Sequence, residues 1–279
     1  MRIQYLGTAA AEGFPGVFCN CEYCRIARSD LNKELRTRSQ ALIDNDLLID
    51  FGPDTYWHSL RFGLDLSAVK YVLVTHSHTD HFYAQELVNR GGNFAKQMKS
   101  AKIHIFANSE VLSVYREGTA REMSENIAHH IQFVQVHPFE KFNIGEYEIM
   151  TLPASHSKSE EALLYSVTKG GKTLFYLNDT GLVREECYQF LSKNGVKAEF
   201  VSMDCTFADS PGPHSERHMG FEQNEIVRQK LIQYGLVFNN TQYYVTHFSH
   251  NSAPFAERME KEALKRGFYA AHDGLVIEF

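Results

Sequence analysis

The sequence lacks any long hydrophobic run. No segment approaches the roughly 18–20 consecutive apolar residues that cross a bilayer, and the first eight residues contain no apolar stretch of signal-peptide length. We therefore expect a cytoplasmic protein without a membrane partner. An excess of positive charge is also absent, because the net charge is −6. Broad nucleic-acid binding needs a basic face, so we do not expect nucleic acid as a partner, although a small basic pocket for one phosphate is compatible with this charge.

Cysteine is scarce as well, with five among 279 residues. Three of them lie within six residues, and in a reducing compartment such a cluster binds metal more often than it forms disulfides. Internal repeats, low-complexity segments and linkers are absent from the sequence. Because 43% of the residues are hydrophobic, the chain can bury a sizeable core. We therefore predict a single domain over residues 1–279.

Short apolar stretches alternate with helical patterns along most of the chain. This alternation of strand and helix patterns predicts an α/β (α+β) fold with two sheets packed on each other and helices outside. Residues 7–38 differ, because they form an irregular segment that contains the three clustered cysteines. The expected strands are 2–6, 40–44, 47–51, 72–74, 102–106, 131–136, 147–152, 162–168, 172–177, 198–204, 242–246 and 274–278. The expected helices are 82–98, 109–117, 184–194, 223–234 and 254–266.

The apolar strand at 72–74 is followed by four side chains that bind metals: His76, His78, Asp80 and His81. His76 and His78 are two residues apart, so in extended chain they point the same way. A turn after them brings Asp80 and His81 to the same volume from another side. The alternative is a solvated polar loop, but four potential ligands within six residues favour a site for two adjacent metal ions.

Three further candidates follow later strands: His156, Asp179 and His247. Each alone has a structural interpretation, because a histidine at a strand end is usually a hydrogen-bonded residue. Asp179 lies in Asn-Asp-Thr-Gly, which is also ordinary turn chemistry. Their recurrence at strand ends, together with the preceding motif, favours one shared metal site.

The cysteine cluster consists of Cys19, Cys21 and Cys24. Its alternative interpretation is a set of small buried hydrophobic residues. A tetrahedral structural zinc needs a fourth ligand and usually has no open position. His250 lies three residues beyond His247 and can face away from the first site, so we predict a Cys₃His zinc site. Cys187 and Cys205 have no such neighbours, and we interpret them as core residues.

These motifs resemble the metallo-β-lactamase-fold superfamily over essentially the whole chain. The resemblance implies a four-layer αββα sandwich with a dinuclear site at one edge. It also implies that Asp179 bridges two ions, each held by one set of three residues: His76, His78 and His156, or Asp80, His81 and His247. An aspartate at the bridging position, instead of the cysteine of dinuclear lactamases, favours other hydrolase branches such as those that cleave phosphodiesters.

Within that superfamily, the cysteine cluster together with His247-x-x-His250 resembles the phosphoribosyl 1,2-cyclic phosphate phosphodiesterases of the carbon–phosphorus lyase pathway. Gly7-Thr8-Ala9, Asp204-Cys205-Thr206-Phe207 and Asp273-Gly274 also resemble that branch. The resemblance implies a metal-dependent phosphodiesterase whose active-site histidine is His218, with His214 as second choice. The implied catalytic residues are therefore Asp80 and His218, and the implied cofactors are two divalent ions, Mn or Zn, plus one structural Zn.

The expected partner is a small phosphate-ester substrate, and the sequence is also compatible with a homodimer. Four cations are available for a second substrate phosphate or for the solvated surface: Arg36, Arg38, Lys158 and Arg217. Two other functions stay open at this point, since one fold supports many chemistries. They are an RNA-processing nuclease of the same fold and a non-hydrolytic protein that uses the site for redox chemistry or binding.

Overall fold

Two sheets form the centre of the molecule in the computed structural model, which describes residues 1–210 and 216–279. Over these described residues each sheet has seven strands. The first sheet has the order β14 (Val276–Glu278), β1 (Arg2–Gly7), β2 (Gln40–Ile43), β3 (Leu47–Ile49), β4 (Tyr71–Leu73), β5 (Ile103–Ala107) and β6 (Ile131–Gln135). The second has the order β13 (Tyr269–Ala270), β12 (Val237–Thr246), β11 (Ala198–Asp204), β10 (Lys172–Leu177), β9 (Leu163–Lys169), β8 (Tyr147–Pro153) and β7 (Lys141–Ile144).

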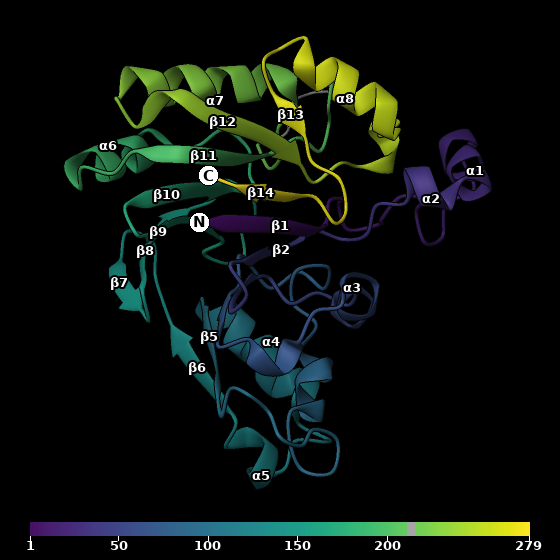
Figure 1. Cartoon of the computed structure of the whole chain (residues 1–279), viewed down its shortest axis with the longest axis vertical. Helices are drawn as coiled ribbons and strands as arrows, with labels where there is room; N and C mark the ends of the chain where they lie inside the picture. Colours follow the sequence, from purple (N-terminus) through teal and green to yellow (C-terminus); the bar gives the residue numbers. More distant parts are fainter. Residues whose placement is uncertain (211–215) are drawn as a thin grey trace.

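Helices cover the outer face of each sheet (Figure 1). The second sheet is covered by α6 (Glu185–Lys193), α7 (Phe221–Gln233) and α8 (Ala256–Leu264). The first sheet is covered by α3 (Thr55–Phe62), η1 (Leu66–Ala68), η2 (Ala84–Asn89) and α4 (Ser109–Thr119), while α5 (Glu125–Ala128) lies at the end near β6. Two short helices, α1 (Glu22–Ser29) and α2 (Leu31–Glu34), project beyond the sheets in Figure 1. A last single turn, η3 (His250–Ser252), follows β12.

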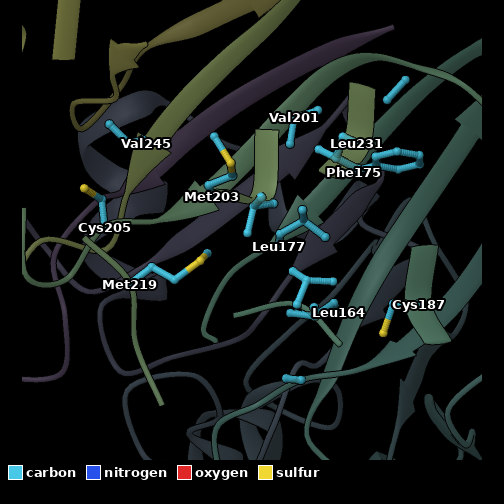
Figure 2. Close-up of a cluster of buried hydrophobic side chains, with 14 of the residues drawn as sticks. Leu164, Phe175, Leu177, Cys187, Val201, Met203, Cys205, Met219, Leu231 and Val245 are labelled. Carbon is cyan, nitrogen blue, oxygen red and sulfur yellow. The ribbon is translucent and has the colours of Figure 1, made fainter. Parts of the chain in front are cut away.

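The buried side chains separate into layers that match this arrangement. Along β10, Leu174 and Tyr176 pack between the sheets, whereas Phe175 and Leu177 pack under the helices. Successive strand residues point to opposite faces, so a strand covered on both sides becomes a continuous apolar run. Figure 2 shows the layer beneath α6 and α7, where side chains of the second sheet meet those of the helices. The predicted αββα sandwich is confirmed.

Parallel strand pairs bring the chemically active residues to one edge. In the first sheet β3, β4 and β5 are parallel, and in the second β10, β11 and β12 are parallel. The carboxyl ends of parallel neighbours meet at the same edge of a sheet. The residues at or just after these ends are Asp50, His76, Asp179, Asp204 and His247.

One predicted helix is wrong. Residues 82–98 contain only the single 3₁₀ segment η2, and the chain after Asn89 runs through turns. Gly91 and Gly92 have φ values of 136° and 59°, conformations that glycine tolerates and that cannot continue a right-handed helix. Among the described residues no helix is both long and apolar enough to cross a membrane.

Candidate metal centres

The first centre is built around the turn that follows β4. The backbone N–H groups of His81 and Phe82 both donate to the carbonyl of His78, each at 2.9 Å. This turn folds the chain back, so that His81 faces the same volume as His76. The sequence-based expectation of a turn between the two pairs of ligands is confirmed.

Two sets of ligand atoms meet here. In one, Nδ1 of His78 lies 2.8 Å from Nε2 of His76 and 3.1 Å from Nε2 of His156. The other consists of Asp80, His81 and His247, whose ligand atoms lie within 4.8 Å of one another. The structure therefore brings all of these predicted residues together, in the two sets that the sequence resemblance implied.

Asp179 lies between the two sets. Its Oδ2 is 3.5 Å from Nε2 of three imidazoles, those of His81, His156 and His247. It is 3.9 Å from Nε2 of His76. A single carboxylate oxygen thus faces ligands of both sets, as a bridging residue must.

Hydrogen bonds to Nδ1 hold the imidazoles so that Nε2 faces the centre. Nδ1 of His81 donates to Asp50 at 2.7 Å, and Nδ1 of His156 donates to the carbonyl of Arg217 at 3.2 Å. Nδ1 of His247 pairs with the hydroxyl of Thr206 at 2.8 Å. An imidazole whose Nδ1 carries the proton offers its Nε2 lone pair to a metal.

Two of these nitrogens support the fit of a metal directly. Nε2 of His81 and Nε2 of His247 are buried without a hydrogen-bond partner among the described residues. Buried polar atoms are nearly always paired, so two converging exceptions beside carboxylates indicate a site for a cation. The donor set of imidazoles and carboxylates suits Zn, Mn and Fe.

The pKa shifts at the centre favour metal binding at four of its groups, whereas at His81 the effect of burial is outweighed by the carboxylates of Asp80 and Asp50, which raise its pKa. Burial lowers the pKa of His76 well below its usual value and also lowers that of His156, which favours the neutral, metal-binding imidazole. Burial opposes ionisation of Asp80 and Asp179, but the neighbouring histidines outweigh it and lower the pKa of both carboxyls. Ionised carboxylates in a buried site would attract a divalent cation strongly.

Asp50 is a site residue that the sequence did not reveal. It follows β3 with a φ of 67° and is fully buried. Its carboxylate accepts hydrogen bonds from the backbone N–H and the hydroxyl of Thr75 as well as from His81. Asp50 therefore connects the strand end to a metal ligand, and only the three-dimensional contact shows this.

His218, the histidine that the resemblance implies for the active site, lies beside Asp179 and Asp204. Its Nδ1 is 2.7 Å from Oδ1 of Asp179 and 3.1 Å from Oδ2 of Asp204. Burial disfavours its charge, but Asp204 and Asp179 outweigh burial and raise the pKa of His218 to about 11. His214, the second choice, lies outside the described residues.

Asp204 is a residue of the centre for which the sequence predicts no role. It is the last residue of β11 and is fully buried. The backbone N–H groups of Thr206 and Met219 donate to its carboxylate, each at 3.0 Å. The signal that could have revealed it is the one that revealed Asp179 and His247, an acid or histidine at the end of an apolar strand.

The four candidate cations divide into two pairs. Arg36 is only 4% exposed and donates to the carbonyls of Pro254 and Ala271, so neither suggested role fits it. Arg38 pairs with Asp54 at 2.9 Å.

The other two, Lys158 and Arg217, line a cavity beside His156. A role of either residue in binding a substrate phosphate stays a prediction.

The second centre brings Cys19, Cys21, Cys24 and His250 together, with their ligand atoms within 4.8 Å of one another. Nδ1 of His250 is 3.5 Å from Sγ of Cys24 and 3.8 Å from Sγ of Cys21. All five cysteines of the chain are free of disulfides. Three sulfurs and one imidazole are a donor set that fits structural zinc.

Hydrogen bonds and burial act in opposite directions on the thiols of this cluster. The N–H of Gly16 donates to Sγ of Cys24 and the N–H of Cys21 donates to Sγ of Cys19. A backbone N–H and His250 lower the pKa of Cys21 to about 6, whereas burial raises that of Cys24 to about 11. Cys187 and Cys205 are buried in the core beneath the helices, as predicted (Figure 2).

The two centres are joined by a short stretch of chain. His250 begins η3, three residues after His247. Glu12 accepts from the hydroxyl of Ser249 at 2.6 Å and from the N–H of His250 at 3.0 Å. The N–H of Phe248 donates to the carbonyl of Thr8. The irregular segment is thus attached to the loop that carries a ligand of the first centre.

Comparison with known proteins gives one family and several relatives. The family model described as "Beta-lactamase superfamily domain" matches residues 45–248. Among curated proteins, an octanoyltransferase of Porphyromonas gingivalis (strain ATCC BAA-308 / W83) is 39% identical over 85 residues. Coenzyme PQQ synthesis protein B of Methylobacterium radiotolerans is 34% identical over 93 residues. Each alignment covers 29% of this chain, and they span only 16% and 31% of the two relatives.

Solved structures match over the whole chain. Zn²⁺-bound PqqB from Methylobacterium extorquens superposes with a TM-score of 0.76 at 18% identity, covering both chains completely. A diphosphatase from the PhnP family gives 0.74 at 22% identity, over all of this chain and 97% of the other. The short form of human tRNase Z gives 0.69 at 16% identity, over 100% and 99% of the two chains. At these identities the likeness concerns the fold.

Proposed function

Because this chain belongs to the β-lactamase superfamily, whose neighbours in fold include metal-dependent hydrolases, we propose that it is a dinuclear metal-dependent phosphodiesterase. Its proposed substrate is a small cyclic phosphodiester, with phosphoribosyl 1,2-cyclic phosphate as the first choice. One observation carries the proposal: Oδ2 of Asp179 lies 3.5 Å from histidine nitrogens of both ligand sets. One shared carboxylate between two sets of ligands suits two adjacent ions.

The residues fit two divalent ions, with three ligands for each ion and one carboxylate shared between them. One ion would be held by His76, His78 and His156, the other by Asp80, His81 and His247, and Asp179 would contact both. Bound in this way, such ions supply Lewis acidity toward phosphoryl oxygens and lower the pKa of a water molecule. Manganese and zinc are the proposed metals.

Side chains of the protein would supply the proton transfer and the alignment of the reacting groups. We assign to His218 the transfer of a proton to the leaving oxygen, or the holding of a phosphate oxygen. Asp204 and Asp179 fix its ring through Nδ1. Thr206 pairs with His218 and with His247, so one hydroxyl aligns a metal ligand and a reacting group.

The test combines metal analysis with two hydrolysis assays. The purified protein should hydrolyse bis-(4-nitrophenyl) phosphate with Mn²⁺, and a panel of cyclic phosphates should include the ribosyl 1,2-cyclic phosphate. Turnover that is lost on chelation and restored by Mn²⁺ or Zn²⁺ supports the proposal. The absence of turnover with every metal and ester, in a protein with a full metal complement, would contradict it.

A nuclease that processes RNA is the alternative, supported by the likeness in fold to human tRNase Z over the whole chain. The net charge of −6 weighs against it. Cleavage of a precursor tRNA at rates above those for small esters would select the nuclease. Bound iron with oxygen reactivity and no ester turnover would instead select a non-hydrolytic protein.

A further inference from the structure

The imidazole of His78 is held differently from the other histidines of the two ligand sets. Its Nδ1 faces the neighbouring ligands, at 2.8 Å from Nε2 of His76 and 3.1 Å from Nε2 of His156. Each of the other four imidazoles pairs through its outer nitrogen, Nδ1, with a hydroxyl, a carboxylate or a backbone carbonyl. The outer nitrogen of His78 is Nε2, and no hydrogen bond from the described residues reaches it. The ring of His78 therefore lacks the partner that orients the other rings.

His78 is also the exposed member of these sets, because the other histidines and both aspartates are buried. Packing therefore does little to fix its ring. In an imidazole Nδ1 is bonded to the ring carbon next to Cβ, so the position of this nitrogen follows the backbone more closely than that of Nε2 does. The place of the ligand atom then depends on what holds the backbone of residues 77–78.

Glu160 binds the residue that lies between His76 and His78. Its Oε2 accepts from the backbone N–H of Ser77 at 3.0 Å, and its Oε1 accepts from the hydroxyl of the same serine at 2.8 Å. Hydrogen bonds to an ionised carboxylate are stronger than those between neutral groups. The two oxygens together fix both the backbone and the side chain of Ser77.

Asn108 anchors Glu160 in turn. Its Nδ2 donates to Oε2 of Glu160 at 2.9 Å and to the backbone carbonyl of Glu161 at 3.0 Å. Asn108 is only 2% exposed and caps α4, since its Oδ1 accepts from the N–H of Val111. The carboxylate that holds Ser77 is thus attached to a buried side chain at the start of a helix.

This contact joins the two segments that supply one ligand set. Glu160 lies four residues after His156, and Ser77 lies between the other two ligands of that set. A second bond between the same segments comes from the N–H of Leu163, which donates to the carbonyl of Thr75 at 2.8 Å. The histidines of the other ligand set are oriented by hydrogen bonds to different residues.

We propose that Glu160 is a positioning residue of the first centre, which keeps Nδ1 of His78 beside Nε2 of His76 and His156. It stabilises the ion of that ligand set and has no direct effect on the ion of the other set. The inference rests on the two-ion part of the proposed function and is independent of the ester that is hydrolysed.

The test measures the affinity of the first centre for Mn²⁺, a metal that suits nitrogen and oxygen donors better than thiolates. Glu160→Ala should weaken the binding of one of two Mn²⁺ ions about 10–100-fold, the usual effect of losing a group that orients a ligand. The other ion and the Tm should stay at their wild-type values. Glu161→Ala is the matched control, because the exposed side chain of Glu161 pairs with His137 and its removal leaves the carbonyl that Asn108 contacts.

A double-mutant cycle separates positioning from a general loss of structure. In His247→Ala, where the set that contains His78 stays complete, Glu160→Ala should again weaken Mn²⁺ binding about 10–100-fold. In His78→Ala, the ligand that Glu160 positions is already gone, so adding Glu160→Ala should have no further effect. Equal loss of affinity in both backgrounds, or wild-type affinity in Glu160→Ala itself, would overturn the proposal.

The readout also distinguishes this proposal from the proposed reaction. A protein that hydrolyses no ester but loses one Mn²⁺ ion selectively in Glu160→Ala would support the positioning role and contradict the phosphodiesterase. Ester turnover together with unchanged Mn²⁺ affinity in Glu160→Ala would do the reverse.

Discussion

The two candidate metal centres of this chain differ in donors, surroundings and access. The first offers nitrogen and oxygen atoms at the edges of two sheets, with carboxylates behind the ligands and a cavity beside them. The second offers three sulfurs and one nitrogen in a peripheral segment, with backbone N–H groups around the sulfurs. Structural zinc sites are closed, whereas catalytic sites keep a position for water or substrate. On the basis of this contrast we propose that the first centre carries out the chemistry and that the second stabilises the fold.

The two centres have different proposed roles, although each takes one ligand from the same short loop. His247 and His250 lie three residues apart, yet one belongs to each centre. The short loop between them is tied to the N-terminal segment through Glu12 and Thr8. Loss of metal at the second centre should therefore loosen the loop without removing any ligand of the first.

The largest effect is expected for Asp179→Ala. This change removes a carboxylate oxygen that faces both ligand sets, so bound metal at the first centre and hydrolysis should both be lost, with activity falling by at least about 10³-fold. The measurements are elemental analysis and bis-(4-nitrophenyl) phosphate turnover. Asp65→Ala, at an exposed ion pair with Lys99, is the control. Hydrolysis retained in Asp179→Ala would refute the bridging role.

His218→Gln should have the next largest effect. Because the side chain is assigned to proton transfer and not to metal binding, kcat should fall about 10²–10⁴-fold while the metal content stays at the wild-type value. His137→Gln, an exposed histidine paired with Glu161, serves as the control. Loss of metal together with activity would show that His218 is a ligand instead of a reacting group.

Asp50→Asn tests the carboxylate that accepts the Nδ1 hydrogen bond of the metal ligand His81. The substitution keeps the shape but weakens the charge that orients His81, so metal affinity or activity should fall about 10–100-fold. Titration of the metal-free protein with Mn²⁺, followed by turnover, measures both quantities. Wild-type affinity in Asp50→Asn would mean that the hydrogen bond to His81 has no part in holding the ion.

Cys21→Ser should change activity least and stability most directly. Zinc binding to a small site contributes to folding, so the variant should lose one metal equivalent and its Tm should fall by roughly 5–10 °C. Cys187→Ala, a buried cysteine of the core, is the matched control and should keep the full metal content. An unchanged zinc stoichiometry and Tm in Cys21→Ser would argue against a structural site.

Much of the candidate site could be predicted from sequence because its residues follow a local rule. An apolar strand that ends in a histidine or an acid is visible without any structure, and it identified His76, Asp179 and His247. Asp204 obeys the same rule at the end of β11. The same rule could therefore have predicted a site role for Asp204, whose neighbour Cys205 lies in the core.

The remaining features depend on contacts between distant segments. Asp50 and His81 are 31 residues apart, and the role of Asp50 exists only through their hydrogen bond. Arg36 is buried by carbonyl groups more than 200 residues away. The helix expected over 82–98 does not form for a local reason, because Gly91 and Gly92 adopt positive φ. The spacing of apolar residues in the sequence does not reveal that these two glycines adopt a positive φ.

The most direct test of the account is the metal content of three proteins measured side by side: wild type, Asp179→Ala and Cys21→Ser. Two independent centres predict three equivalents in the wild type, loss of the dinuclear pair with retention of the thiolate-bound zinc in Asp179→Ala, and loss of that zinc alone in Cys21→Ser. Loss of all metal together in either variant, or a single equivalent in the wild type, would contradict it.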